Sequence, residues 1–130
     1  MDLKEAREFF ANDLFAVKQT NAVIDEVGDG FALCSMEYRK EHLNAAGSVM
    51  GGAIFTLADF AFAVASNSTG RLTVSLSSQI SFMSPPKGGK LFAKACRIKE
   101  GRNTCFYEVT VTDAENRRVA NVSVTGYIKG

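Results

Sequence analysis

Hydrophobic spacing predicts two helices in the chain. Near the N-terminus, apolar side chains recur at intervals of three or four residues: Leu3, Ala6, Phe9, Phe10 and Leu14. This spacing is typical of an amphipathic helix, which we expect over about residues 2–14. Residues 53–65 are rich in alanine and apolar on every face, so we predict a helix over about residues 52–66 that is buried on all sides.

The rest of the chain has the pattern of β-strands. Residues 72–83 alternate apolar side chains with serine, threonine and glutamine, as a half-buried strand does. Further β-rich segments are residues 22–27, 31–38, 91–99, 104–112 and 117–128. The last three connections are too short for crossover helices, so we expect an antiparallel meander. A curved antiparallel sheet of five to six strands wrapped around the apolar helix, an α+β fold, is the simplest architecture that satisfies both patterns.

Composition narrows the class of protein. A chain of 130 residues with 46% hydrophobic content is expected to form one domain with its own core. The 15 basic and 14 acidic residues nearly cancel, which argues against nucleic-acid binding. The apolar residues 53–65 fall short of the ~20 needed to cross a bilayer, so no membrane association is expected. Three cysteines and an N-terminus without an apolar leader point to the cytoplasm.

The residue inventory excludes several kinds of site. His42 is the only histidine, and none of the three cysteines forms a Cys-x-x-Cys pair, so no spacing supports a metal site. Charged neighbours make His42 a surface or loop-fixing residue. The glycines at 47 and 52 have the spacing of a phosphate loop, but Ala53 and Ile54 follow where lysine and serine or threonine are required. Any chemistry is therefore expected to use carboxylates or backbone groups, without metal or cofactor.

Asp59 is the only charge in the apolar helix, where an ionised carboxylate needs an explanation. Either it has a structural role, at a wet edge of the helix or as an acceptor of hydrogen bonds from neighbouring backbone, or it carries a function. Gly52 lies about two helical turns earlier on the same face, roughly 10 Å along the axis. Gly51 and Gly52 leave the partly positive N–H groups of the first turn accessible. This arrangement suits an oxyanion site with Asp59 as nucleophile or base, although a glycine pair also permits a tight turn into a helix.

The motif around these residues resembles a known family. Residues 42–52, followed by Leu57-Ala58-Asp59, resemble the signature of hotdog-fold thioesterases, specifically the PaaI-type acyl-CoA thioesterases. The resemblance covers about residues 22–127. It implies a single hotdog domain over residues 1–130 that pairs with a second copy, as a homodimer or a dimer of dimers, with an active site across the interface.

The resemblance also implies roles for individual residues. Asp59 would be the nucleophile or general base, Gly52 or Gly51 the oxyanion donor, and Asn44 an orienting group, although loop asparagines more often form turns. Ser75 would come from the partner chain.

A second set of residues would bind the substrate: Met50, Gly47, Val74 and Arg102. Arg102 suits a phosphate of CoA, although an arginine in a hairpin is usually solvated.

Met50 departs from the family pattern, which typically has histidine before the two glycines. Its thioether can line an apolar acyl pocket. The leading hypothesis is an acyl-CoA thioesterase that releases a free acid and CoA. The alternative is a non-catalytic acyl-CoA binding protein, because the expected histidine is missing.

Overall fold

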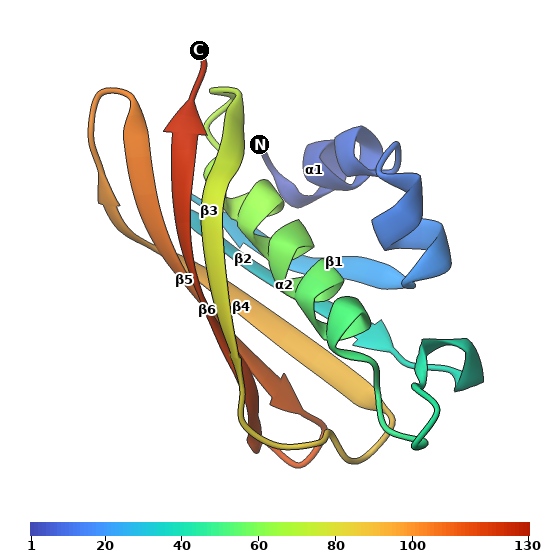
Figure 1. Ribbon diagram of the computed structural model, residues 1–130. Coiled ribbons are helices and arrows are strands. Elements are labelled where there is room, and N and C mark those ends of the chain that lie inside the picture. The colour runs from blue at the N-terminus through green and yellow to red at the C-terminus, as the bar shows by residue number, and fades with distance from the viewer.

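The computed structural model describes residues 1–130 and shows an antiparallel sheet curved around one central helix (Figure 1). The helical elements are α1 (Leu3–Phe10), the π-helical turn η1 (Phe15–Gln19), the 3-10 turn η2 (Lys40–His42) and α2 (Gly51–Ser66). The strands are β1 (Ala22–Gly28), β2 (Phe31–Glu37), β3 (Thr73–Phe82), β4 (Lys90–Glu100), β5 (Thr104–Asp113) and β6 (Arg118–Ile128). The predicted α+β architecture is confirmed, with six strands. None of the helices has the length and apolar character needed to cross a membrane.

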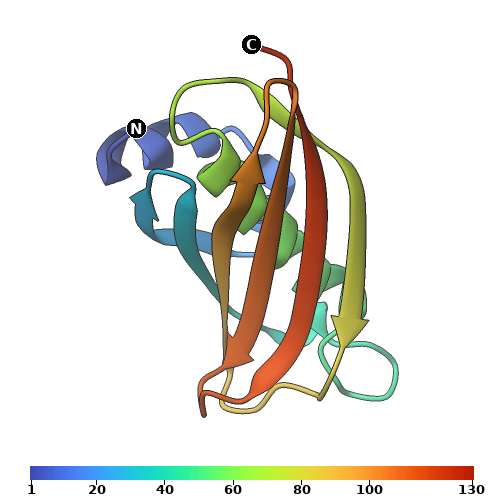
Figure 2. The same cartoon turned by 90° about the vertical axis from the view of Figure 1, so that its left-hand side faces the viewer.

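The strand order corrects one part of the prediction. The order is β1-β2-β4-β5-β6-β3, with every pair antiparallel. β4, β5 and β6 form the expected meander, but β3 pairs with β6 rather than with β4 (Figure 2). Three strand spacings of about 4.8 Å separate β3 from β4, and the extended residues 83–89 can span that distance. A short link therefore does not require two strands to be neighbours.

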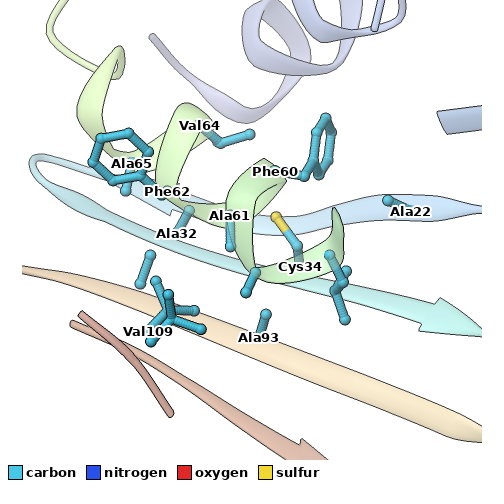
Figure 3. Packing of buried hydrophobic residues seen from close by; sticks show 14 of the residues in the cluster. Ala22, Ala32, Cys34, Phe60, Ala61, Phe62, Val64, Ala65, Ala93 and Val109 are labelled. Carbon is cyan, nitrogen blue, oxygen red and sulfur yellow. The ribbon is translucent and has the colours of Figure 1, made fainter. Parts of the chain in front are cut away.

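The core forms where α2 packs on the concave face of the sheet. Ala58, Ala61 and Ala65 of α2 are fully or almost fully buried, as are Ala32 and Ala93 on the facing strands (Figure 3). These small side chains allow the helix to lie close to the sheet. Larger buried side chains complete the core, and Phe62 packs edge-on against Tyr107 with ring centroids 5.3 Å apart.

One face of α2 is less buried than the sequence predicts. An open stripe of residues at helical spacing remains at least partly accessible: Gly52, Phe55, Thr56, Asp59 and Ala63. The sheet covers the opposite face of the helix, while α1 and η1 lie on the far side of α2 from β3 (Figure 1). The expectation of burial on all sides is therefore wrong, because the N-terminal segment covers this face only in part.

The N-terminal helix is shorter than predicted. Asp2 and Glu5 form a capping box at its start, with the Asp2 carboxylate accepting from Glu5 N at 2.8 Å. The helix ends at Phe10, and the Asn12 side chain donates to the Phe9 carbonyl at 3.0 Å. This side-chain contact competes with continuation of the helix. Residues 15–19 then form the separate turn η1.

A buried carboxylate holds residues 83–89, the link from β3 to β4, in place. Asp113 is 2% exposed and accepts hydrogen bonds from the backbone N–H groups of Lys87, Glu115 and Arg117, at 2.9–3.0 Å. The Arg117 guanidinium pairs with it at 3.0 Å. Burial alone would raise the pKa of Asp113, but these donors lower it to about 2.

We expect Asp113→Asn to lower the free energy of unfolding at neutral pH, because an amide cannot accept all of these hydrogen bonds. The folded-state pKa lies below the ordinary 3.8, so the ionised carboxylate stabilises the fold above about pH 4 and loses this effect toward pH 2. Urea unfolding of both proteins across that range should therefore show a difference that shrinks on acidification. Asp29→Asn, at an exposed ion pair with Arg97, is the control and should change stability little. Equal stability of the Asp113 variant and wild type at pH 7 would contradict this account.

Candidate active site

Asp59 lies at the centre of the open stripe, in a cleft between α2 and the start of η1. The cleft has a volume of about 410 Å³. Its walls are formed by Asp13, Leu14, Phe15, Ala16, Phe55, Thr56, Asp59, Phe60 and Ala63. Most of these side chains are apolar, and none is a cation. Burial raises the pKa of Asp59, and the negative charge of Asp13 raises it further.

The N-terminus of α2 presents two backbone donors without acceptors. The Met50 carbonyl accepts from Ala53 N and Ile54 N, at 3.0 and 3.2 Å, and Met50 provides no side-chain cap. Neither Gly51 N nor Gly52 N donates a hydrogen bond to an acceptor in the chain. Free N–H groups at a helix N-terminus carry partial positive charge, so they can stabilise a developing negative charge on a ligand.

The two glycines have different surroundings. A Cβ atom on Gly51 would lie 2.9 Å from the Phe82 ring, so packing requires the absence of a side chain there. A Cβ atom on Gly52 would meet only Met50 Cγ, at 3.9 Å. Neither residue has a positive φ, so the turn into the helix does not require glycine at either position. Nothing within the single chain explains glycine at position 52.

A second cleft, of about 420 Å³, adjoins the cleft around Asp59 at the N-terminal end of α2. It is lined by Phe15, Gln19, Thr20, Glu41, His42, Met50, Gly52, Ala53 and Thr56. Phe15 and Thr56 line both clefts. We refer to the two clefts together as the α2 groove, which extends from the free N–H group of Gly52 to the carboxylate of Asp59.

His42 is buried and links two segments that border the α2 groove. The residue is 7% exposed, so the surface interpretation is wrong and the loop-fixing interpretation is confirmed. Its Nδ1 accepts from Arg39 N at 2.9 Å, and its Nε2 donates to the Gln19 carbonyl at 2.8 Å. The His42 carbonyl accepts from Met50 N at 2.8 Å. His42 therefore connects the end of η1 to the residue that precedes α2.

Asn44 and Gly47 shape the loop before α2. The Asn44 side-chain oxygen accepts from Ala46 N and Ser48 N, at 3.0 and 3.1 Å, which is the turn-forming role of a loop asparagine. Gly47 has a φ of 84°, a conformation that favours glycine. Neither residue lines the α2 groove of this chain.

Three other predicted site residues lie away from the groove. Val74 and Ser75 are exposed on β3, an edge strand with one unpaired side. Arg102 is exposed in the hairpin between β4 and β5. A single chain thus brings together Met50, Gly51, Gly52 and Asp59 of the predicted set, all at or on α2.

Sequence reasoning missed two parts of the groove. Thr56 lies between Gly52 and Asp59 at helical spacing, and this spacing was a usable signal. Asp13, Leu14 and Phe15 form the opposite wall. The local pattern placed Asp13 and Leu14 at the end of the predicted first helix and assigned no role to Phe15. Their position depends on how η1 packs against α2, which no local pattern reports.

Comparison with known proteins places this geometry in a family. A family model described as thioesterase superfamily matches residues 46–120. A putative esterase from Archaeoglobus fulgidus is 41% identical over 108 residues, which cover 82% of this chain and 70% of the relative. The acyl-coenzyme A thioesterase PaaI of Escherichia coli is 30% identical over 118 residues, covering 90% of this chain and 84% of that protein.

Solved structures agree with the sequence comparisons. The E. coli PaaI structure superposes with a TM-score of 0.86 at 28% identity, covering 98% of this chain and 96% of its own. A hypothetical thioesterase from Streptococcus pneumoniae, solved with coenzyme A, gives a TM-score of 0.87 at 28% identity, covering 95% and 97% of the two chains. Two alanine mutants of an S. pneumoniae protein of the same description have also been solved, one at an aspartate and one at a threonine.

The fold and site define a hotdog-fold protein. The chain belongs to the thioesterase superfamily, and within it to the PaaI type.

The unpaired carboxylate of Asp59 should cost the protein stability. Because the folded state raises its pKa above 3.8, ionised Asp59 destabilises the fold above that raised pKa, and this cost disappears below about pH 3.8. We expect Asp59→Asn to unfold at a higher Tm than wild type at pH 7, with the two values converging on acidification. Thermal unfolding at several pH values measures this, with Glu115→Gln, at an exposed turn, as control. A lower Tm for Asp59→Asn at pH 7 would show that the carboxylate has a stabilising partner.

Proposed function

We propose that this thioester hydrolase acts on acyl-CoA and releases a free carboxylic acid and CoA, with Asp59 as nucleophile or general base and Gly52 N–H as oxyanion donor. One observation carries the proposal. A free N–H group and an unpaired carboxylate lie on the same face of α2 and border the same groove. A thioester carbonyl bound to Gly52 N–H would have its oxygen just beyond the start of α2, because the free N–H groups point out of that end of the helix. An Asp59 carboxylate would then approach the carbonyl carbon across the interface with a second copy of the chain.

The reaction can follow two courses from this arrangement. With Asp59 as base, the carboxylate takes a proton from water while the water oxygen bonds to the carbonyl carbon. The C–S bond then breaks, and the thiolate of CoA leaves and takes up that proton. With Asp59 as nucleophile, its oxygen bonds to the carbonyl carbon, the thiolate leaves, and water hydrolyses the mixed anhydride. In both courses Gly52 N–H stabilises the negative charge on the carbonyl oxygen.

The lining of the groove suits an apolar, uncharged acyl group. Leu14, Phe15, Phe55 and Phe60 offer apolar contacts, while Asp13 adds negative charge and no cation balances it in the cleft around Asp59. Met50, 51% exposed, contributes a thioether beside Gly52 in place of the expected histidine. An acyl group that carries its own carboxylate would be repelled by both aspartates. The bound coenzyme A of the S. pneumoniae relative supports CoA as the other half of the substrate.

We expect the complete site to include a second copy of the chain. β3 is a ten-residue edge strand with one unpaired side, and Val74, Leu76 and Phe82 on it are exposed. Such an edge favours pairing with another strand. Pairing would also bring the partner's Ser75 toward the groove. The two positions replaced in the S. pneumoniae protein are separated by the same number of residues as Asp59 and Ser75, which supports a joint role for this pair.

Release of free thiol from acyl-CoA tests the proposed function directly. We expect wild type to release thiol and Asp59→Asn to lose roughly 100-fold or more in kcat, because the amide neither accepts a proton nor attacks a carbonyl. Met50→His should remain active and should stay dependent on Asp59. Glu115→Gln is the control for removal of a carboxylate elsewhere.

Two results would contradict this assignment. Full turnover by folded Asp59→Asn would exclude Asp59 as the reactive group. Saturable acyl-CoA binding without thiol release by wild type would instead identify a non-catalytic binding protein.

The two glycines provide a second test, because only Gly52 has open space in front of its backbone. We expect Gly52→Ala to retain or raise Tm, since alanine favours helix by about 0.5–1 kcal/mol, and to lose at least about tenfold in kcat because its methyl group obstructs the donor. Gly51→Ala is the matched comparison and should lower Tm through its contact with Phe82. Thermal unfolding and thiol release measure both effects. Unchanged turnover by Gly52→Ala would remove Gly52 from the proposed site.

A further inference from the structure

The cleft around Asp59 has an exposed rim and a buried inner end. Leu14 and Phe15 form part of the rim, and Phe15 is 67% exposed. Phe60 lines the same cleft but is only 3% exposed, and Ala16 is also buried. A ligand that enters the cleft from the rim therefore passes exposed apolar side chains and ends at Phe60.

A separate apolar pocket of about 210 Å³ lies on the other side of Phe60, between α1, η1 and β1. We refer to it as the α1 pocket. Besides Phe60, its apolar lining consists of Phe10, Ala11, Val17, Ala22, Val23 and Ile24. Phe60 is the only residue that lines both the α1 pocket and the cleft around Asp59. Along η1, Ala16 lines the cleft and the next residue, Val17, lines the pocket.

The α1 pocket suits an alkyl chain. Its only charged side chain is Arg7, which donates from Nε and Nη2 to the Ile24 carbonyl at 3.0 and 2.8 Å. These two hydrogen bonds fix the guanidinium at the wall of the pocket. Phe10 packs edge-on against Phe60 with ring centroids 5.9 Å apart, so the ring that separates the two cavities is held in place.

We propose that Phe60 ends the acyl-binding site and limits the substrate to acyl groups short enough for the cleft around Asp59. This inference rests on the proposed function. Because the Asp59 carboxylate approaches the carbonyl carbon, the acyl chain bonded to that carbon begins beside the same cleft. A short chain fits among Leu14, Phe15 and Phe55. A longer chain meets the Phe60 ring before all of its carbons have left water.

Packing explains why one ring sets the length of the acyl group. Methylene groups that contact apolar walls strengthen binding in proportion to the area removed from water. A chain that reaches Phe60 gains no further contacts, because the ring is held against Phe10 in a close-packed interior. Removal of the ring would join the cleft to the α1 pocket and add about 210 Å³ of apolar space. Longer chains would then gain contacts that wild type does not offer.

The experiment compares kcat/KM for thiol release from butanoyl-, octanoyl- and dodecanoyl-CoA, at concentrations below micelle formation. We expect wild type to favour butanoyl- over dodecanoyl-CoA by at least about tenfold, and Phe60→Ala to raise the dodecanoyl-to-butanoyl ratio by at least about tenfold. Phe62→Ala is the matched control, because Phe62 is equally buried on α2 but lines neither cavity. It should change the ratio by less than about threefold. Thermal unfolding shows that each variant is folded at the assay temperature.

Two further variants guard against loss of folding and general loosening of the core. Phe60→Leu disturbs packing less than Phe60→Ala and should shift the ratio in the same direction, by about threefold or more. Val23→Phe refills the α1 pocket from the exposed side of β1. Combined with Phe60→Ala, it should reverse the gain for dodecanoyl-CoA. Alone, it should leave the wild-type profile unchanged, because the wild-type acyl chain does not reach the pocket.

Several results would overturn the role of Phe60. They are wild-type turnover of dodecanoyl-CoA equal to that of butanoyl-CoA, equal shifts in Phe60→Ala and Phe62→Ala, and no reversal by Val23→Phe. If Phe60→Ala does not fold, an unchanged ratio in folded Phe60→Leu overturns it as well. If wild type releases no thiol from any acyl-CoA, or if Asp59→Asn is fully active, the proposed function itself fails. Activity that depends on Asp59, with a length profile independent of Phe60, would contradict only this inference.

Discussion

The close packing of α2 on the curved sheet is the contact on which the rest of the structure depends. Alanines on the buried face of the helix meet small side chains on the strands, so the helix axis lies close to the sheet (Figure 3). Because these contacts leave little freedom for the helix to rotate, they also fix the direction of its opposite face. The orientation of Gly52, Thr56 and Asp59 is thus a consequence of core packing. A rigid helix is a more precise support for reactive groups than a loop.

The same arrangement explains how the fold tolerates an unpaired carboxylate. Asp59 is partly withdrawn from water and lies near the negative charge of Asp13, and both conditions disfavour its ionised form. The apolar contacts on the other faces of α2 offset this cost. Replacement of the carboxylate would relieve the destabilisation and would also remove the group that we propose to be reactive, which is the usual conflict between stability and activity at a functional site.

The sequence predicted what depends on local periodicity. The helix α2, the strands and the α+β class followed from apolar spacing, and the link between Gly52 and Asp59 followed from helical geometry. The pairing of β3 with β6 was missed because a short connection limits distance without selecting a neighbour. The wall formed by Asp13 and Phe15 was missed because it arises only when η1 packs against α2. The expected roles of Ser75, Val74 and Arg102 remain predictions, since one chain does not bring these residues to the groove.

The absence of a free histidine is consistent with the chemistry proposed for the groove. Both ring nitrogens of His42 are engaged by backbone groups, so this side chain serves structure rather than proton transfer. Amide hydrolysis in such a site would lack an acid for its strongly basic leaving group. A thiol, however, has a pKa of about 8.5, so a thiolate leaves without prior protonation. One carboxylate that accepts a proton from water, and one N–H group that stabilises the oxyanion, are therefore sufficient for a thioester, and Met50 can replace a histidine without removing a required proton donor.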